Sequence, residues 1–213
     1  MQTIESEWLA ESQQAMRGWD FSHLKGRCQT EELPWNYSAW VRRHLKPSDE
    51  WLDMDTGGGE LMQTFQHPVE KTTVTEGWQP NIDLLKRTLV PQGVTLYPDP
   101  EERLAQVPDE HFDIVTNSHG GLPIRDIARV LRPHGLFVSQ QVGATNNYSL
   151  SRFLNANYVP AFPDNNLPQV MTELREAGFE ILKSDAAFVK MNFTDVGAIV
   201  YLSLIHISEP TRH

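Results

Sequence analysis

Cysteine and long apolar runs are the features in which this sequence is poorest. Cys28 is the single cysteine among 213 residues. It cannot form an internal disulfide and has no second thiol beside it for a metal site, so we expect a reducing, cytoplasmic location. No apolar run approaches membrane-spanning length, and the N-terminal MQTIESEW has neither the basic start nor the apolar core of a signal peptide. We therefore expect no membrane partner.

Basic residues are also scarce. Lys and Arg number 18 against 28 Asp and Glu, which gives a formal net charge of -10 and a pI near 5.2. A surface with this balance is poorly suited to the phosphates of nucleic acid, so we expect a small-molecule partner. The length and a hydrophobic content of 39% are enough for one domain with a full core and a small appendage.

The stretch 49–61 is the most informative part of the chain, because a short apolar strand leads into three glycines and a helix start. Trp51, Leu52 and Met54 supply the strand. The glycines at 57–59 then allow a tight turn and a close approach of the backbone to a ligand. Open α/β sheets bind nucleotide-like ligands at such a turn, and a plain glycine-rich turn is the alternative.

Strand-like and helix-like segments alternate downstream, which predicts a parallel sheet with right-handed crossovers. The run RPHG at 132–135 is expected to break the chain between a helix and a strand. The expected strands are 71–76, 94–97, 112–117, 136–142, 179–182, 186–193 and 196–201, and the expected helices are 81–89, 123–131 and 168–177.

Residues 1–46 differ in character from the rest and hold four of the six tryptophans, Trp8, Trp19, Trp35 and Trp40. A helix is expected at 37–45, whereas the pattern near the N-terminus fits a helix only loosely. Two interpretations remain open. The rings either form a lid over a ligand or cover the open side of the sheet.

Residue spacing separates three kinds of nucleotide site. The phosphate-binding P-loop ends in Gly-Lys-Ser/Thr, and this ending is absent. A dinucleotide fingerprint built on Gly57 and Gly59 requires a third glycine where this chain has Met62, which weakens a nicotinamide site. Asp53 and Glu76 remain, each at the end of a strand, where a carboxylate can accept both hydroxyl hydrogens of a ribose.

The order of the motifs WLDMDTGGGE, VTEGWQPN, FDIVTNSHG and IARVLRPHGLFVSQQVG resembles the class I S-adenosylmethionine-dependent methyltransferase family. The resemblance covers residues 51–201. It implies an α/β, Rossmann-like fold with a seven-stranded sheet in the order 3-2-1-4-5-7-6, whose antiparallel seventh strand corresponds to 196–201. It also implies S-adenosylmethionine as the cofactor and a methyl acceptor as the substrate.

The resemblance assigns cofactor contacts residue by residue. Asp53 would hold the methionine amino group directly or through the loop, Glu76 would take the ribose hydroxyls, and Asn117 lies where the chain passes the methionine end. The other assigned contacts are the turn of Thr56, Gly57, Gly58 and Gly59, Trp78 over the adenine, and Asp99 at the adenine amino group. The alternatives are that Trp78 packs on the following helix and that Asp99 is a solvated loop carboxylate.

Asp55 departs from the family pattern, which has glycine at this position. Its side chain would crowd the cofactor, and a positive φ there would add backbone strain. The alternative is that the carboxylate attracts the positive charges of the cofactor.

His119 is the candidate catalytic residue. Methyl transfer from a sulfonium needs mainly alignment and a dry site, and a base only where the acceptor must lose a proton. His119 follows the fourth strand, where a base can reach an acceptor; a loop histidine bonded to the backbone is the alternative. Asn146, Asn147 and Tyr148 are weaker candidates for substrate contacts, because such residues also form ordinary turns.

The expected acceptor is a small molecule. Family members that methylate the exocyclic amines of nucleic-acid bases carry an Asn/Asp-Pro-Pro-aromatic run at the position of NSHG, and that run is absent here. The alternative functions are an NAD(P)-dependent oxidoreductase and a non-catalytic nucleotide-binding protein.

We expect three regions in the chain: a helical, Trp-rich cap at 1–46, a S-adenosylmethionine-binding methyltransferase domain at 47–201 and a non-native tail at 202–213. The tail LSLIHISEPTR resembles the translated read-through of a transposase adapter used for sequencing libraries. A natural tail that extends the last strand is the alternative. On either view, His206 and His213 are not ligands.

Overall fold

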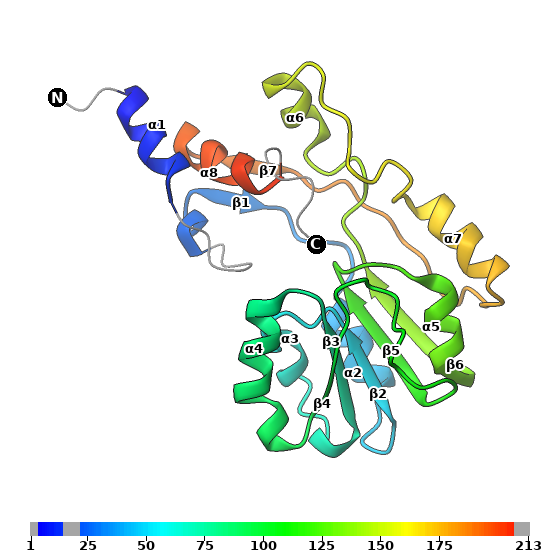
Figure 1. The fold of residues 1–213 in the computed structure, drawn as a ribbon. Coiled ribbons are helices and arrows are strands. Elements are labelled where there is room, and N and C mark those ends of the chain that lie inside the picture. The colour runs from blue at the N-terminus through cyan, green and yellow to red at the C-terminus, as the bar shows by residue number, and fades with distance from the viewer. Residues whose placement is uncertain (1–3, 15–21, 207–213) are drawn as a thin grey trace. The chain divides into compact units, whose positions relative to one another are not determined.

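The computed structural model describes residues 4–14 and 22–206, which form two compact units (Figure 1). The sheet unit comprises 35–143 and 165–184, and the second unit takes its described residues from 1–34, 144–164 and 185–212. Trp19 and His213 lie outside the described residues. The expected division into cap, methyltransferase domain and tail stays a prediction. The two units are defined by compactness, whereas that division concerns the function of each region and the origin of the tail.

A five-stranded parallel sheet forms the centre of the sheet unit, in the order β4-β3-β2-β5-β6 (Figure 1). Asp53 on β2 stands opposite Val74 on β3 and Thr116 on β5. Because the strands are parallel, their carboxyl ends meet at one edge of the sheet, where ligands bind in such folds. The strands are β2 (Trp51–Met54), β3 (Thr72–Glu76), β4 (Thr95–Pro98), β5 (Phe112–Ser118) and β6 (Leu131–Gln140).

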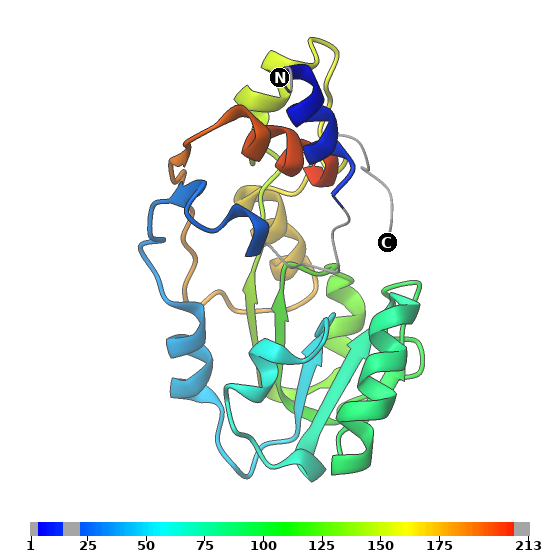
Figure 2. The same cartoon turned by 90° about the vertical axis from the view of Figure 1, so that its left-hand side faces the viewer.

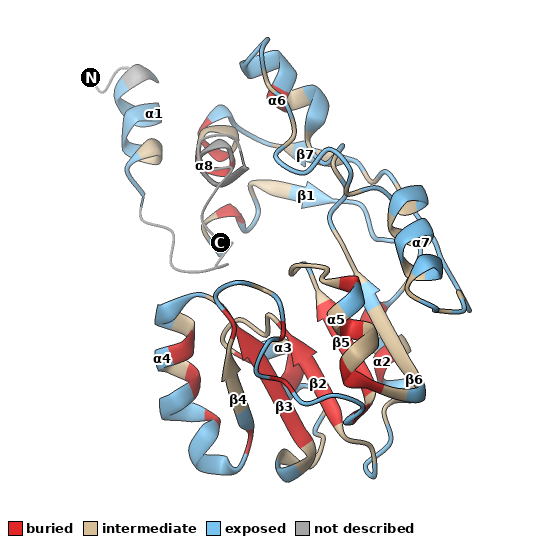
Figure 3. Ribbon diagram, turned by 45° about the vertical axis from the view of Figure 1, so that its right-hand side comes forward, coloured by how far each residue is buried: buried red, intermediate tan, exposed pale blue. Residues whose placement is uncertain are grey.

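Helices cover both faces of this sheet. Trp51 packs with Met62 and Leu85 of α3 and α4, whereas the next residue, Leu52, packs with Ile127 of α5. Neighbouring strand residues point to opposite faces, so both faces need apolar cover. The central strands are accordingly buried almost throughout (Figure 3). The helices of this unit are α2 (Tyr37–His44), α3 (Glu60–Gln63), η2 (Val69–Lys71), α4 (Gln79–Thr88), η3 (Val90–Gln92), α5 (Ile124–Val130) and α7 (Leu167–Glu176).

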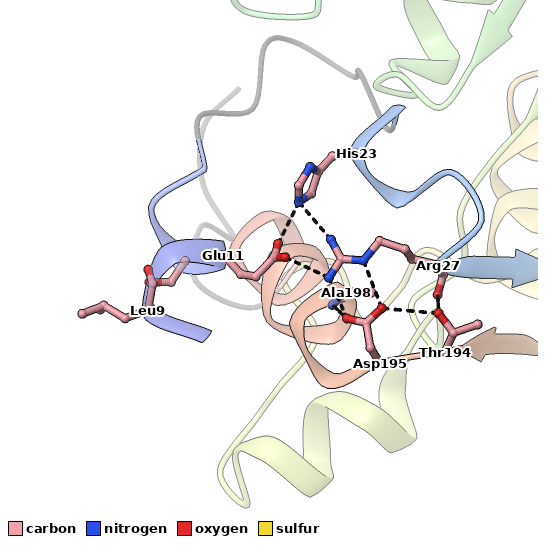
Figure 4. Close-up of polar contacts among 8 residues, drawn as sticks. Leu9, Glu11, His23, Arg27, Thr194, Asp195 and Ala198 are labelled. Carbon is pink, nitrogen blue, oxygen red and sulfur yellow. Dashed lines mark hydrogen bonds and ion pairs between the residues drawn. The ribbon is translucent and has the colours of Figure 1, made fainter. Parts of the chain in front are cut away.

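The second unit is built on an antiparallel pair, β1 (Cys28–Thr30) with β7 (Met191–Phe193). Its helices are α1 (Ile4–Ser12), η1 (Ser22–Leu24), α6 (Tyr148–Leu154) and α8 (Val196–His206), and α1 lies beside α8 (Figures 1 and 2). Arg27 joins Glu11 and Asp195 through ion pairs of 2.9 and 2.6 Å (Figure 4). No helix in the described part of the chain has both the length and the apolar character needed to span a bilayer.

Four expectations for the strands were wrong, and one of them is 186–193, where the only strand is β7 at Met191–Phe193. The segment 196–201 is the start of helix α8, because Asp195 accepts a hydrogen bond from the Ala198 amide and caps the helix. The segment 179–182 is not a strand, and Leu182 is 73% exposed. The run 132–135 does not break the chain but lies within β6, where the register shifts opposite Phe112.

The observed strand order matches the first five positions of the expected sheet, 3-2-1-4-5. The two further strands do not occur in the sheet formed by the described residues. The Rossmann-like α/β class is therefore confirmed for the part of the sheet whose carboxyl ends carry the predicted site.

Candidate functional site

A glycine turn connects β2 to α3. Gly57 and Gly59 have φ of 65° and 83°, which glycine adopts without strain. A Cβ on Gly59 would also lie 2.6 Å from Leu89 Cδ1, so the turn packs closely on the residue that follows α4. The amide of Gly57 donates to Glu76 Oε2 at 2.8 Å, which brings the turn against the end of β3.

Asp53 is buried at the end of β2 and faces inward. Its two carboxylate oxygens accept hydrogen bonds from Thr116 Oγ1 at 2.5 Å and Thr56 Oγ1 at 2.7 Å. Burial raises the pKa of Asp53 to about 6, against the opposing effect of these two hydrogen bonds. The side chain thus fixes the positions of β5 and the glycine turn.

Glu76 has all four of its acceptor positions occupied. Oε1 accepts from the amides of Gly77 at 3.0 Å and Trp78 at 2.8 Å. Oε2 accepts from the Gly57 amide and, at 3.3 Å, from Asn81 Nδ2. A carboxylate offers about four lone-pair positions, so a ribose hydroxyl can bond here only by replacing an existing donor. The long bond from Asn81 is the weakest of the four.

Asp99 and Trp78 lie at the ends of β4 and β3. Asp99 is buried and accepts hydrogen bonds from the amides of Arg103 and Leu104 at 3.2 and 2.8 Å, so the alternative interpretation of Asp99 as a solvated loop carboxylate was wrong. Trp78 is 49% exposed at the start of α4, which leaves much of its ring accessible.

Asp55 adopts the left-handed conformation, with φ of 51°. Its Oδ2 accepts from the Gly121 amide at 3.0 Å, and its side chain occupies the space into which a Cβ on Gly120 would project. Burial raises the pKa of Asp55 to about 7, helped by the negative charges of Glu102 and Glu76. Asp55 therefore fills the space between the β2 turn and the loop after β5.

The carboxyl edge of the sheet is acidic. Asp99 also raises the pKa of Asp55, so carboxylates from the ends of β2, β3 and β4 lie within electrostatic reach of one another. The Arg103 side chain is 73% exposed, and its ion pair is with Glu101 at 4.0 Å. Such an edge favours a ligand with positive charge. Within residues 4–14 and 22–206, no group of three or more His, Cys, Asp or Glu side chains is placed to hold a metal ion.

Asn117 organises the loop after β5. Its Oδ1 accepts from the Gly120 amide at 3.1 Å and from Gln141 Nε2 at 2.6 Å, and its Nδ2 donates to the Gly121 carbonyl at 2.9 Å. This closed loop places His119 in the left-handed conformation, with φ of 69°. Few residues other than glycine adopt that conformation without strain, so the loop constrains the histidine strongly.

His119 is held against the end of β6. Its amide donates to the Gln140 carbonyl at 2.9 Å, and its Nε2 lies 3.2 Å from Gln140 Nε2. Gln140 Oε1 in turn accepts from Trp35 Nε1 at 3.0 Å. The ring keeps an exposed side, and its partial burial lowers the pKa of His119.

Tyr37 is a candidate that no sequence pattern identified. It begins α2, and its buried hydroxyl lies near Asp53, the Thr116 hydroxyl and the Asn117 backbone. None of these approaches has the geometry of a hydrogen bond, so the hydroxyl is unpaired within the described part of the chain. Burial, followed by the charge of Asp53, raises the pKa of Tyr37 above its ordinary value, and the phenol stays neutral.

The structure links most of the predicted residues. Hydrogen bonds connect Thr56 to Asp53 and Gly57 to Glu76. The weaker substrate-contact candidates Asn146, Asn147 and Tyr148 belong to the second unit.

Comparisons with solved structures find similarity in fold at low sequence identity. A chain from the complex between the Haloferax volcanii methyltransferase activator Trm112 and a proposed methyltransferase matches with a TM-score of 0.55 and 14% identity, over 78% of this chain and 74% of that one. A S-adenosylmethionine-dependent methyltransferase from Mesorhizobium loti matches with a TM-score of 0.51 and 11% identity, over 68% and 81%. The [4+2]-cyclase SpnF matches with a TM-score of 0.50 and 21% identity, over 68% and 57%.

No family model and no curated protein matches the sequence. The similarity therefore lies in the fold, whose five parallel strands and glycine turn agree with the resemblance of the motifs. The chain has the Rossmann-like fold of the class I S-adenosylmethionine-dependent methyltransferases.

Proposed function

We propose that this protein is a S-adenosylmethionine-dependent methyltransferase that acts on a small-molecule acceptor. The observation that carries the proposal is the acidic carboxyl edge of a methyltransferase-type sheet, where Asp53, Asp55, Glu76 and Asp99 gather around the glycine turn. S-adenosylmethionine carries sulfonium and ammonium charges that suit such an edge. A dinucleotide brings a negatively charged diphosphate, which these carboxylates repel.

The residues present fit this cofactor in chemical type. The unpaired Tyr37 hydroxyl offers a buried donor beside Asp53, a feature expected where a polar ligand completes the hydrogen bonding. Glu76 would take the ribose hydroxyls in place of its long bond from Asn81, and Trp78 would cover the adenine.

The remaining cofactor contacts come from the glycine turn and the neighbouring loops. Thr56, Gly57, Gly58 and Gly59 would bring the backbone close, while Asp99 and Asn117 shape the loops on either side. The bound cofactor supplies an electrophilic methyl group, so the protein's own task is alignment and exclusion of water.

Asp55 limits the space available. Its side chain fills the gap beside Gly121, where the resembling family has glycine. We infer that binding requires this carboxyl to move, and that wild-type affinity is weaker than that of a glycine variant.

His119 is the residue we propose on the acceptor side. Asn117 and Gln140 position it next to the turn that carries Asp55, with one side of its ring open to solvent. The acidic net charge of -10 and the absence of an Asn/Asp-Pro-Pro-aromatic run support a small acceptor over nucleic acid.

Ligand-dependent melting separates this function from the oxidoreductase alternative. A ligand that binds the folded state raises the melting temperature, so S-adenosylmethionine should stabilise the protein and NADH should not. Stabilisation by NADH alone would contradict the proposal.

Turnover separates an enzyme from a non-catalytic binding protein. Transfer of an isotopically labelled methyl group to pooled small metabolites should be detectable, and His119→Ala should lower it by about 100-fold while cofactor affinity is retained. Binding without any transfer would favour the non-catalytic alternative. A fold shared with the [4+2]-cyclase SpnF makes this test necessary, because fold alone does not determine chemistry.

A further inference from the structure

Trp35, Gln140 and His119 form a hydrogen-bonded chain of side chains at the end of β5 and β6. The indole Nε1 of Trp35 lies 3.0 Å from Gln140 Oε1, and Gln140 Nε2 lies 3.2 Å from His119 Nε2. The main chain supports the arrangement, because the His119 amide donates to the Gln140 carbonyl at 2.9 Å. All three residues belong to the sheet unit.

The direction of each hydrogen bond follows from the chemistry of the groups. An indole N–H is a donor only, so Gln140 must turn its carbonyl oxygen toward Trp35. The amide NH₂ of Gln140, which is also a donor only, then faces His119. The ring nitrogen Nε2 can bond to it only as an acceptor, without a proton of its own.

We propose that Trp35 and Gln140 are positioning residues that hold neutral His119 with its proton on Nδ1. An unconstrained neutral imidazole prefers the opposite form, with the proton on Nε2, so the arrangement selects the less favoured tautomer. Protonation of the ring would place two donors face to face, which disfavours the cation as well.

This tautomer gives His119 a particular role, which rests on the proposed function. The lone pair of Nε2 is engaged by Gln140, and Nδ1–H has no hydrogen-bond partner among the residues that the structure describes. His119 therefore presents a donor to the acceptor molecule and serves as a base only if Gln140 moves. The substrate class that matches is a small molecule with a carbonyl, carboxylate or other lone-pair acceptor near the methylated atom.

The nitrogen chemical shifts of His119, measured by NMR on the ligand-free protein, test the proposal. The wild type should show a protonated Nδ1 and an unprotonated Nε2 near neutral pH. Measured at a pH where the ring is neutral, Gln140→Glu should reverse the two, because a carboxylate accepts from both Trp35 Nε1–H and His119 Nε2–H, although its charge also favours the doubly protonated ring at lower pH. Trp35→Phe should bring in the Nε2-protonated form, because the amide of Gln140 is then free to turn over.

Matched controls lie in the same unit. Gln92→Glu adds the same charge near η3, where the Gln92 amide bonds only to Thr88 O in the described residues. Trp40→Phe removes an indole that stacks on His44. Neither should change the tautomer of His119.

Two results would overturn the proposal: a proton on Nε2 in the wild type, or an unchanged tautomer in folded Gln140→Glu. If Trp35→Phe does not fold, the His119 tautomers of the wild type and of Gln140→Glu still test the proposal. Because the measurement needs no cofactor, it can fail while the proposed methyltransferase function stands, and it can succeed while that function fails.

Discussion

At the scale of single residues, Asp55 has the greatest predicted effect on ligand binding. Its carboxyl group is bonded to the Gly121 amide and fills the space beside the glycine turn. Asp55→Gly should tighten S-adenosylhomocysteine binding about tenfold, equivalent to ~1.4 kcal/mol, because the obstructing side chain is removed. Calorimetric titration of both proteins measures the change. Unchanged or weaker binding would show that the carboxylate attracts the cofactor instead.

Asp55 should also make stability depend on pH. Its pKa is about 7 in the folded protein, above the ordinary value of 3.8. The folded state therefore holds the proton more tightly than the unfolded state, and stability falls as the pH rises from about 4 to about 7. The buried Asp53, with a pKa of about 6, acts in the same direction.

Asp55→Asn removes the first of these effects. An amide oxygen can still accept from Gly121, and Asn tolerates the left-handed conformation. Above pH 8 the variant should melt roughly 5 °C higher, from ~2 kcal/mol of relieved desolvation and repulsion, and near pH 4 it should match the wild type. Asp83→Asn, an exposed change on α4, should show no such pH-dependent gain. An equal gain at both pH values would exclude titration of Asp55 as its cause.

Tyr37→Phe separates a structural role from a role in binding. The hydroxyl has no partner in the described residues, so its removal should leave the ligand-free melting temperature unchanged or higher. If the hydroxyl bonds the cofactor, S-adenosylhomocysteine affinity should fall by about tenfold, as for the loss of one buried hydrogen bond. Equal affinity in the two proteins would remove Tyr37 from the site.

Residue types and spacing predicted the carboxylates at the strand ends, but they did not predict how those groups are used. Asp53 and Glu76 were found as acidic residues next to the glycine turn. The bond from Asn81 to Glu76 depends on how α4 begins after β3, and the bond from Thr116 to Asp53 depends on distant parts of the chain meeting at the sheet edge. Tyr37 was missed for the same reason, since only folding places the start of α2 beside β2 and β5.

At the scale of elements, the turn between β2 and α3 depends on Gly59. Its φ of 83° is strained for any other residue, and a Cβ there would meet Leu89 at 2.6 Å. Gly59→Ala should lower the free energy of unfolding by about 2–4 kcal/mol, from backbone strain and overpacking together. Gly178 has a φ of 93°, and a Cβ there would meet open space. Gly178→Ala should therefore lower the free energy of unfolding by only about 1–2 kcal/mol, from backbone strain alone. Equal losses in denaturant titrations would mean that packing on Leu89 does not matter.

The spacing of apolar residues predicted an element well where the element buries a single apolar face. The helix expected at 81–89 is α4 at Gln79–Thr88, with Ile82 and Leu85 buried. The segment 196–201 was misassigned because a short, wholly apolar run fits a buried helix as well as a strand. The cap from Asp195 and packing against Leu24 decide in favour of α8, and neither is visible in the local pattern.

At the scale of the whole molecule, the fold and the acidic carboxyl edge of the sheet both favour a positively charged ligand such as S-adenosylmethionine. The five-stranded sheet has the first five positions of the strand order that the resemblance implied, and its carboxyl edge is lined by acidic groups. The acceptor molecule follows from neither feature, because acceptor specificity depends on particular side chains rather than on the sheet. The cytoplasmic location stays a prediction from the single cysteine.

Calorimetric titration with S-adenosylhomocysteine, with NADH as a parallel control, decides whether the protein binds the methyltransferase cofactor. We expect saturable binding of S-adenosylhomocysteine alone, weak in the wild type and tighter in Asp55→Gly. Binding of NADH in preference, or no binding of S-adenosylhomocysteine by the folded Asp55→Gly protein, would contradict it.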